Sequence, residues 1–340
     1  MDLALSFDDV LLVPQYSEVE SRFKDVNINQ TLVHLGQFSL PIISSPMDTI
    51  TEIDMATSMY TAGGLGIIHR YNTISEQCDM VAKVVEEGRM VGAAIGVTGN
   101  FVERARALRD AGVNLLCLDV AHGHHSNVRY ALEVLRNTLG DSIHIMAGNV
   151  ATREAFEDLA DWGADSIRVG IGGGSICSTR TQTGHGVPTF QSILDCAQSD
   201  RDVVMVADGG IRNSGDIVKA LAAGADFVMA GSLLAGTDES PGEVMVNSDG
   251  IVCKTYRGMA SKEAQYDWRG RYSSIEGVSH CVRLRGPVDN ILETLDTGIR
   301  SGLSYSGASN VPMLQVKAKF IRQTTSGQIE SSTHIKRNGL

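Results

Sequence analysis

Short, nearly continuous apolar segments recur along the chain, separated by polar stretches of a dozen residues or more. Segments of this length without polar alternation are typical of strands in a parallel sheet that helices cover on both faces. They predict buried strands at residues 41–45, 65–69, 90–96, 115–121, 144–150, 166–172, 203–209 and 227–232.

Patterns with helical spacing lie between these segments. The clearest of them predict helices at residues 102–111, 128–138, 153–161 and 215–223. Several end next to a glycine, among them Gly112, Gly163 and Gly224, and glycine is favoured where a helix stops with positive φ. Eight strand–helix alternations predict a (β/α)8 barrel, an α/β fold, although a doubly wound sheet has the same linear pattern.

The rest of the chain flanks this repeat. We expect an N-terminal arm, a loop-rich excursion, a helix and a polar C-terminal tail, at about residues 1–35, 238–286, 289–301 and about 320–340. The connection between strands two and three, residues 70–89, has room for one helix only. With no break in composition, residues 1–340 are expected to form one catalytic barrel domain without an inserted regulatory domain.

Composition excludes several classes of protein. The 340 residues are 43% hydrophobic and 5% aromatic and include 36 glycines, which suits βα units better than a β-sandwich. The formal net charge of −11 argues against nucleic-acid binding, because that needs a basic surface. No uncharged apolar run approaches the ~18 residues of a membrane helix, and the acidic N-terminus is unlike a signal peptide.

The cysteines have no CxxC pairs and no histidines at zinc spacing. They are Cys78, Cys117, Cys177, Cys196, Cys253 and Cys281. Cys78, Cys117 and Cys196 lie within helical or strand patterns and are expected to pack as small hydrophobes. A reduced, cytoplasmic chain fits this distribution.

Candidate chemistry lies where strands seven and eight end. Barrel active sites form at the carboxyl ends of the strands, and phosphate commonly binds after the last two. Asp208, Gly209 and Gly210 follow strand seven, and Gly231 and Ser232 follow strand eight. Backbone amides can approach an anion there, and Asp208 can accept ribose hydroxyls. One such turn is ordinary, but two at these strands favour a phosphorylated ligand.

The most unusual segment follows strand six. Four glycines within residues 170–174 can turn several carbonyls inward around a monovalent cation. Cys177 comes next, with Arg180 nearby and no apolar periodicity around it. A cationic neighbour on a mobile loop favours a thiolate nucleophile.

Three other segments have two interpretations each. Met47, after strand one, is either rim packing or a wall for a flat ring. Residues 119–124 contain an acid and two histidines, and polar contacts at the barrel mouth are favoured over zinc because no third ligand has a diagnostic spacing. In the long excursion, Glu276 is either a general acid/base or a solvated charge, and the residues alone favour the solvated charge.

Several motifs together resemble the IMP dehydrogenase/GMP reductase family over nearly the whole chain. They are SFDDVLLVP (6–14), SSPMDTITE (44–52), GNVAT (148–152), GIGGGSICSTRTQTG (170–184), ADGGIRNSGDI (207–217), GSLLAGTDESPGE (231–243) and YRGMAS (256–261). The resemblance implies a (β/α)8 barrel assembled as a homotetramer. It also implies that Cys177 attacks C2 of a purine nucleotide and forms a covalent thioimidate.

Two reactions occur in this family. The dehydrogenase oxidises IMP with NAD to XMP, using a long flap with an Arg-Tyr pair and usually regulatory modules between strands two and three. This chain lacks that insertion, and Met259 is followed too soon by Glu276 for a long flap. The Arg271-Tyr272 pair lies immediately before Glu276, where a long flap would have intervened.

Other motifs divide between the two reactions. Ser21-Arg22 and residues 119–124, 284–290 and 299–308 look like the reductase. The segments 44–52, 207–216 and 326–334 are closer to the dehydrogenase. On balance the resemblance favours GMP reductase, which makes IMP and ammonia from GMP with NADPH.

The resemblance assigns roles residue by residue. Cys177 is the nucleophile, and Thr179 with Glu276 moves protons. The implied substrate-binding residues are Ser45, Met47, Ser175, Asp208, Gly209, Gly210, Gly231, Ser232, Tyr256, Gly258, Met259, Ala260 and Gly277. The implied NADPH-binding residues are Ser21, Arg22, Arg70, Asp119, Val120, Ala121, Gly172, Met259, Ser301 and Gly302, of which Ser21, Arg22 and Arg70 match positions that a neighbouring subunit offers. The implied potassium-binding residues are Gly172, Gly174, Cys177 and Arg180.

Three alternatives stay open at this point. They are a flapless IMP dehydrogenase, a non-catalytic purine-nucleotide-binding barrel, and a flavin-dependent barrel enzyme, since barrels of the last kind bind phosphate at the same strands. The presence of Cys177, Thr179 and Glu276 together speaks against a purely binding protein, because binding needs no nucleophile.

Overall fold

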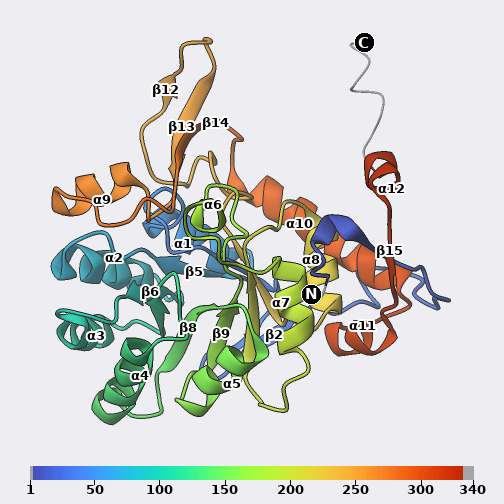
Figure 1. Cartoon of the computed structure of the whole chain (residues 1–340), viewed down its shortest axis with the longest axis horizontal. Coiled ribbons are helices and arrows are strands. Elements are labelled where there is room, and N and C mark those ends of the chain that lie inside the picture. Colours follow the sequence, from blue (N-terminus) through green and yellow to red (C-terminus); the bar gives the residue numbers. More distant parts are fainter. Residues whose placement is uncertain (1–2, 332–340) are drawn as a thin grey trace.

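Eight parallel strands close into a barrel in the computed structural model, which describes residues 3–331 (Figure 1). The strands are β4 (Ile42–Ser44), β5 (Leu65–Ile68), β6 (Gly92–Ile95), β7 (Leu115–Asp119), β8 (His144–Val150), β9 (Ser166–Val169), β10 (Val204–Asp208) and β11 (Phe227–Ala230). Each lies within its predicted range, and pairing of β11 with β4 closes the ring. The barrel prediction is confirmed, and the doubly wound alternative is wrong.

A helix on the outside of the barrel follows every strand. These helices are α1 (Ile53–Thr61), α2 (Ile74–Glu86), α3 (Phe101–Asp110), α4 (Ser126–Leu139), α5 (Arg153–Asp161), α7 (Thr189–Cys196), α8 (Ser214–Ala222) and α10 (Val288–Tyr305). Local sequence sets their starts: Thr73 accepts a hydrogen bond from the Glu76 amide, and the Glu76 carboxylate binds the Thr73 amide in a capping box that begins α2.

Apolar side chains fill the barrel and seal its amino end. A hairpin of β2 (Gln30–Leu32) and β3 (Gly36–Phe38) lies across that end. Its buried Phe38 packs edge-on against Phe227 of β11, with ring centroids 6.3 Å apart. The floor of the barrel is therefore closed by packing, which leaves the carboxyl ends of the strands for a site.

The arm and the tail, predicted as separate pieces, pair with each other. β1 (Val10–Leu12) of the arm runs antiparallel to β15 (Phe320–Arg322), with Val10 opposite Arg322. A short turn of helix, η1 (Phe7–Asp9), precedes β1, while α11 (Val311–Lys317) and α12 (Thr325–Glu330) flank β15. The remainder of the predicted tail, residues 332–340, lies outside the described residues.

The excursion after strand eight is more ordered than its sequence predicts. It contains a three-stranded antiparallel sheet of β12 (Met245–Val246), β13 (Val252–Arg257) and β14 (Ser279–Arg283), and the helix α9 (Lys262–Arg269). In Figure 1 this sheet projects from the barrel. The expectation of loops was wrong because these strands are short and half exposed, so that pairing rather than an apolar run defines them.

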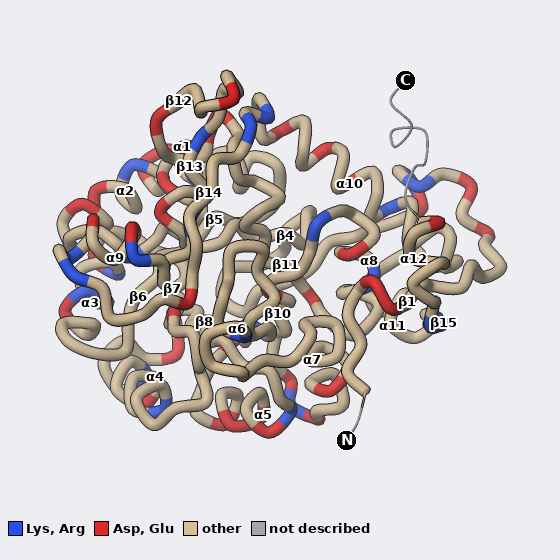
Figure 2. The backbone as a smooth tube through the Cα atoms, turned by 45° about the horizontal axis from the view of Figure 1, so that its top comes forward, with Lys and Arg blue, Asp and Glu red and all other residues tan. Residues whose placement is uncertain are grey.

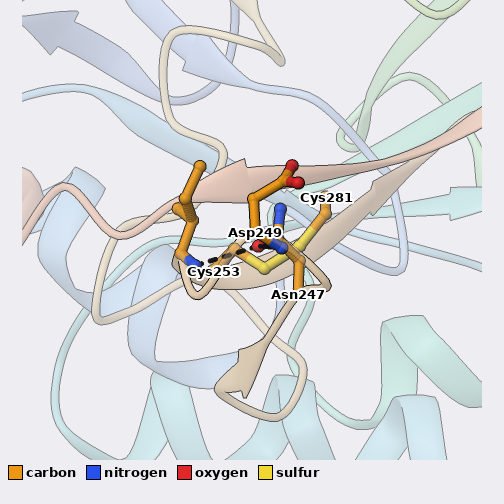
Figure 3. The surroundings of a disulfide bond; sticks show 5 residues. Asn247, Asp249, Cys253 and Cys281 are labelled. Carbon is orange, nitrogen blue, oxygen red and sulfur yellow. Dashed lines mark hydrogen bonds between the residues drawn. A yellow bond between two sulfur atoms is a disulfide. The ribbon is translucent and has the colours of Figure 1, made fainter.

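A disulfide joins two strands of this sheet, which corrects the expectation of a fully reduced chain. Cys253 of β13 and Cys281 of β14 are bonded, with Cα atoms 5.8 Å apart (Figure 3). Cys253 lies opposite Arg283 in the ladder, so the two cysteines are diagonal neighbours. Their separation of 28 residues gives no sign of this contact, because only the register of the two strands creates it.

Charged residues lie mainly on the outer helices and loops, with both signs interspersed (Figure 2). Within residues 3–331, no helix combines the length and the apolar character needed to cross a membrane. The barrel strands are largely uncharged, and the exceptions, Asp119, Arg168 and Asp208, lie toward their carboxyl ends.

Candidate active site

A cavity of about 570 Å³ opens at the carboxyl ends of the barrel strands. Most of the predicted site residues line it, drawn from six βα loops and the excursion. They are Ser45, Met47, Arg70, Asp119, Val120, Ala121, Gly172, Gly174, Ser175, Cys177, Thr179, Asp208, Gly209, Gly210, Gly231, Ser232, Tyr256, Gly258, Met259, Ala260 and Glu276. The fold thus brings together residues that are far apart in the sequence, from Ser45 to Glu276.

Six predicted residues lie elsewhere. Gly277 is just behind the cavity wall, in a β-bridge with Cys177. Arg22 of the arm hydrogen-bonds Ser301 of α10 outside the cavity lining. The others outside the lining are Ser21, Gly302 and Arg180.

Cys177 stands at the centre of the cavity, beside a hydroxyl and a carboxylate. Its thiol is free and exposed, and Sγ is 3.2 Å from Thr179 Oγ1. Thr179 Oγ1 donates to Glu276 Oε2 at 2.8 Å. Because this uses the only hydroxyl proton of Thr179, the thiol must be the donor in the contact between Cys177 and Thr179. The hydrogen bonds therefore run from thiol to hydroxyl to carboxylate.

The backbone explains how Glu276 reaches this position. The Ser178 amide donates to the Glu276 carbonyl at 2.9 Å, and the Val278 amide donates to the Ile176 carbonyl at 3.0 Å. The excursion thus pairs with the cysteine loop as an added strand. Glu276 is thus half-buried, and its carboxylate accepts a hydrogen bond from Thr179 beside the thiol, a contact that favours the interpretation as a general acid/base.

Two glycine turns meet at the end of the cavity beside β10 and β11. Gly209 and Gly210 have φ of +89° and +79°, which favours glycine. A Cβ at Gly231 would lie 3.1 Å from the Tyr256 hydroxyl, so the backbone approaches this side chain closely. Burial raises the pKa of Tyr256 to about 12, with Ser175 as its hydrogen-bond partner. Close-packed amides and neutral hydroxyls of this kind suit an anion such as phosphate.

Arg168, which the sequence analysis missed, joins two carboxylates at the cavity floor. It donates to Asp119 Oδ1 at 2.7 Å and to Asp208 Oδ2 at 2.9 Å. Burial alone would raise the pKa of Asp119, but the charges of Arg168 and Arg70 outweigh it and lower that pKa below its ordinary value. A signal was present, because an arginine inside an apolar strand is rarely buried without acidic partners.

An aromatic pair forms the outer wall, and it was also missed. Tyr71 and Trp268 stack with centroids 4.2 Å apart and planes 11° apart, and the Arg70 guanidinium lies over both rings. The Tyr71 hydroxyl donates to the Met259 carbonyl at 2.7 Å. Tyr71 follows a predicted strand, but Trp268 comes from a helix that the sequence pattern did not reveal.

The glycine-rich loop is held by Arg180. Its guanidinium donates to the Ile171 and Val187 carbonyls, at 3.3 and 2.7 Å. The Cys177 amide donates to the Gly174 carbonyl at 3.1 Å. Arg180 therefore braces the loop rather than contacting the thiol.

The histidines after strand four turn away from this centre. His124 Nε2 contacts Asp158 at 2.8 Å and its ring lies against Trp162, so it makes polar contacts with α5.

Known proteins resemble the chain over its whole length. A family described as "IMP dehydrogenase / GMP reductase domain" matches residues 4–334. Inosine-5′-monophosphate dehydrogenase from Cryptosporidium parvum is 39% identical, over 97% of this chain and 94% of that protein. GMP reductase from Leishmania major is 33% identical, over 97% and 96%. A crystal structure of GMP reductase C318A from Trypanosoma brucei in complex with guanosine 5′-monophosphate has a TM-score of 0.93 and 32% identity, covering 98% of each chain.

The lengths of these alignments bear on the missing insertion between strands two and three. The alignment with the Leishmania major reductase extends over 476 positions, and that with the Cryptosporidium parvum dehydrogenase over 385. The reductase thus carries longer segments that this chain lacks. The absence of an insertion does not distinguish the two reactions.

Proposed function

Because the chain belongs to the IMP dehydrogenase/GMP reductase family of oxidoreductases, which use a nicotinamide nucleotide, we propose that it is a GMP reductase. The reaction is GMP + NADPH + 2 H⁺ → IMP + NADP⁺ + NH₄⁺. The observation that carries the proposal is the contact of Glu276 with Thr179 beside Cys177. By contrast, Arg271 and Tyr272 lie outside the cavity lining, and Tyr272 is exposed under the Lys262 ammonium. The pair that would serve the dehydrogenase therefore lies outside the cavity that contains Cys177.

Different groups of cavity residues bind the ribose, the phosphate and the base of the nucleotide. Asp208 accepts ribose hydroxyls, and the turns of Gly210 and Gly231 with Ser175 and Ser232 bind the 5′-phosphate. The guanine lies between Met47 and the backbone of residues 258–260 and 277. This places C2 of the base next to Cys177.

The thiol-to-carboxylate hydrogen bonds supply the protons of the first half-reaction. Cys177 passes its proton through Thr179 to Glu276, and the sulfur adds to C2 of GMP. Glu276 returns that proton through Thr179 to the 2-amino group, which leaves as ammonia and leaves a thioimidate on Cys177. The thiol proton is therefore the third hydrogen of the ammonia, and no outside acid is needed.

The second half-reaction restores the thiolate. The nicotinamide supplies a hydride to C2 when bound. The bond between C2 and Cys177 Sγ then breaks, the electron pair stays on sulfur, and IMP is released.

The cofactor residues proposed are those toward β7. The Asp119 carboxylate, kept ionised by Arg168, fits a ribose hydroxyl, and Val120, Ala121 and Gly172 continue the same wall with Met259. Arg70 is already engaged with the Asp119 carbonyl at 3.1 Å. Recognition of a 2′-phosphate therefore falls to Arg22, with Ser21, Ser301 and Gly302 beside it. These four residues lie outside the cavity lining, and we propose that a neighbouring copy in a homotetramer supplies them. Arg70, which the family resemblance assigned to a neighbouring subunit with Ser21 and Arg22, lines the cavity of its own chain instead.

Potassium is proposed at the glycine-rich loop. The Gly172, Gly174 and Cys177 carbonyls lie on the turn that Arg180 braces, and carbonyl oxygens suit this ion. Gly172 has no room for a side chain, since a Cβ there would lie 2.6 Å from Arg180. The ion would steady the loop that carries the nucleophile.

A second candidate is an IMP dehydrogenase with a short flap. The observation in its favour is the 39% identity to the Cryptosporidium parvum dehydrogenase, against 33% to the Leishmania major reductase. Two assays separate the candidates: loss of NADPH absorbance with GMP, and formation of NADH with IMP and NAD. The proposal fails if only the second reaction occurs.

The nucleophile is tested by Cys177→Ala. Turnover should fall below detection, while GMP binding, measured by calorimetry, stays within about threefold. Cys78→Ala, at another free cysteine, is the matched control and should keep full turnover.

A further inference from the structure

Gln265 of α9 is a buried amide that ties three segments of the excursion together. Its side chain is 2% exposed. Nε2 lies 3.0 Å from the Ala260 carbonyl, 3.2 Å from the Ser261 carbonyl and 2.8 Å from the Ser274 carbonyl. The same nitrogen thus holds the loop under the base and the segment that leads to Glu276.

The amide oxygen of Gln265 binds the other side of that segment. Oε1 accepts from the Ser273 amide at 3.0 Å and from the Ser274 amide at 3.3 Å. Arg269 donates to it at 2.5 Å and to Ser273 Oγ at 2.5 Å. The turn at residues 273–274 is therefore held by the side chains of Gln265 and Arg269 rather than by a regular ladder, and only Gln265 binds its backbone amides.

This turn connects directly to the proposed acid/base. Ser274 Oγ donates to Glu276 Oε1 at 3.3 Å, while Thr179 donates to Oε2 at 2.8 Å. Both carboxylate oxygens are thus oriented, one from the cysteine loop and one from the turn that Gln265 fixes. Displacement of the turn would remove one of the two.

We propose that Gln265 is a positioning residue that sets the Glu276 carboxylate against Thr179 and Cys177 through the turn of Ser273 and Ser274. This inference rests on the proposed function for the role of Glu276. It adds that the short connection between α9 and Glu276 is aligned by a side chain that is hydrogen-bonded to the turn and not to Glu276 itself.

The molecule offers a matched control. Gln77, in the first turn of α2 as Gln265 is in the first turn of α9, is also fully buried. Its Nε2 donates to the Ile68, His69 and Ala94 carbonyls, and its Oε1 accepts from Arg104. Gln77 does not line the cavity, so it makes the same kind of contacts without reaching Glu276.

The first test compares Gln265→Met with Gln77→Met. Methionine keeps the size and removes the amide. We expect Gln265→Met to lower kcat about 10-fold to 100-fold, because misplacement of a catalytic group by about 1 Å has this effect. KM for GMP should change less than twofold. Gln77→Met should lower the melting temperature comparably and leave kcat within about twofold.

The second test needs no turnover. The rate at which iodoacetamide alkylates Cys177 is followed by peptide mass spectrometry from pH 5 to 10. Glu276→Gln should alter the pH profile, and Gln265→Met should shift it in the same direction, while Gln77→Met keeps the wild-type profile. If the wild-type protein does not reduce GMP, the proposed function fails, yet this profile still decides the role of Gln265.

Ser274→Ala guards against a folding defect in Gln265→Met. It removes one hydroxyl at the surface of the turn and should shift the alkylation profile in the same direction, by less. The double variant should be no more than about twofold worse than Gln265→Met, since both act on one contact. A wild-type profile and kcat in Gln265→Met, or no difference between Glu276→Gln and the wild type in alkylation, would overturn the proposal.

Discussion

The two halves of the cavity are built in different ways. The barrel half, with Asp119, Arg168 and Asp208, rests on parallel strands whose neighbours pair on both sides and whose cores are buried. The excursion half, with Met259 and Glu276, rests on a small antiparallel sheet and a few side-chain contacts.

Individual ion pairs fasten the second half to the first. Arg257, at the end of β13, donates to Asp48 after β4 at 2.7 and 2.9 Å, and it also contacts Asp267 of α9. In the proposed reaction, the barrel half binds the ribose and the phosphate, while the excursion half forms one wall for the base and carries Glu276, the proposed proton-transfer group. An excursion attached in this way can change in length without disturbing the barrel. This is consistent with a family whose relatives are named for two reactions.

Arg168→Met should have the largest effect on stability and turnover, because it removes the buried cation of the barrel half. It leaves Asp119 and Asp208 buried without their cation, which costs about 3–5 kcal/mol of unfolding free energy. Urea unfolding measures this cost. The variant should also lose both its affinity for GMP and its turnover. Arg201→Met, which breaks an exposed pair with Asp161, should change stability by less than about 1 kcal/mol.

The pH dependence of that loss gives a separate prediction. The pKa of Asp119 is lowered from 3.8 in the folded chain, so its contribution to stability is present above 3.8 and is lost as the pH falls through the lowered value. In Arg168→Met, burial should instead raise this pKa. The stability gap between the two proteins should therefore begin to narrow as the pH falls through the raised pKa of Asp119 in the variant, and narrow further as it falls through the lowered pKa in the wild type. A gap that stays constant would contradict the ionised state of Asp119.

Glu276→Gln should have the next largest effect on turnover, and it changes a residue of the excursion half only. We expect kcat to fall about 100-fold or more, because proton transfer by a positioned group contributes that much. The melting temperature and KM for GMP should stay near the wild-type values. A parallel rise in KM would show that the Glu276 carboxylate itself contributes to GMP binding, in addition to the backbone of residues 258–260 and 277.

Tyr71→Phe tests the seam between the halves and should act more weakly. The variant loses the hydrogen bond to the Met259 carbonyl but keeps the stack on Trp268. Loss of one such bond predicts a rise of about twofold to tenfold in KM for GMP. Tyr130→Phe, at an exposed position on α4, is the control and should change nothing.

Reduction of the bond between Cys253 and Cys281 should affect turnover least. Five residue pairs hold β13 to β14 without it, so the base of the excursion keeps its register. We expect kcat in dithiothreitol, and in Cys281→Ser, to stay within about twofold of the oxidised protein. A tenfold loss would mean that the ladder alone does not hold Glu276 in place.

The barrel half could be predicted from the sequence to a much greater extent than the excursion half. Barrel strands are readable because burial on both faces demands apolar runs, and Asp208 and Gly210 follow from where such strands end. Cys177 stood out as a cysteine without apolar periodicity after the glycine-rich loop, whereas the acid/base role of Glu276 was implied only by the family resemblance. Arg168 and Trp268 were missed because their roles depend on partners more than thirty positions away. The disulfide and the sheet of the excursion depend on strand register, which linear spacing does not encode.

The pairing of arm and tail has a consequence for how the chain assembles. The ladder of β1 with β15 joins residues more than three hundred positions apart, so its contact order is among the highest in the molecule. Phe7 and Phe320 both pack edge-on against Phe190 of α7, with centroids 5.7 and 5.1 Å away, which joins the ladder to the barrel wall. During synthesis β1 leaves the ribosome long before its partner exists. Because β1 and β15 lie side by side, a circular permutant that links these two strands and opens at the turn of Asn247 should retain the barrel.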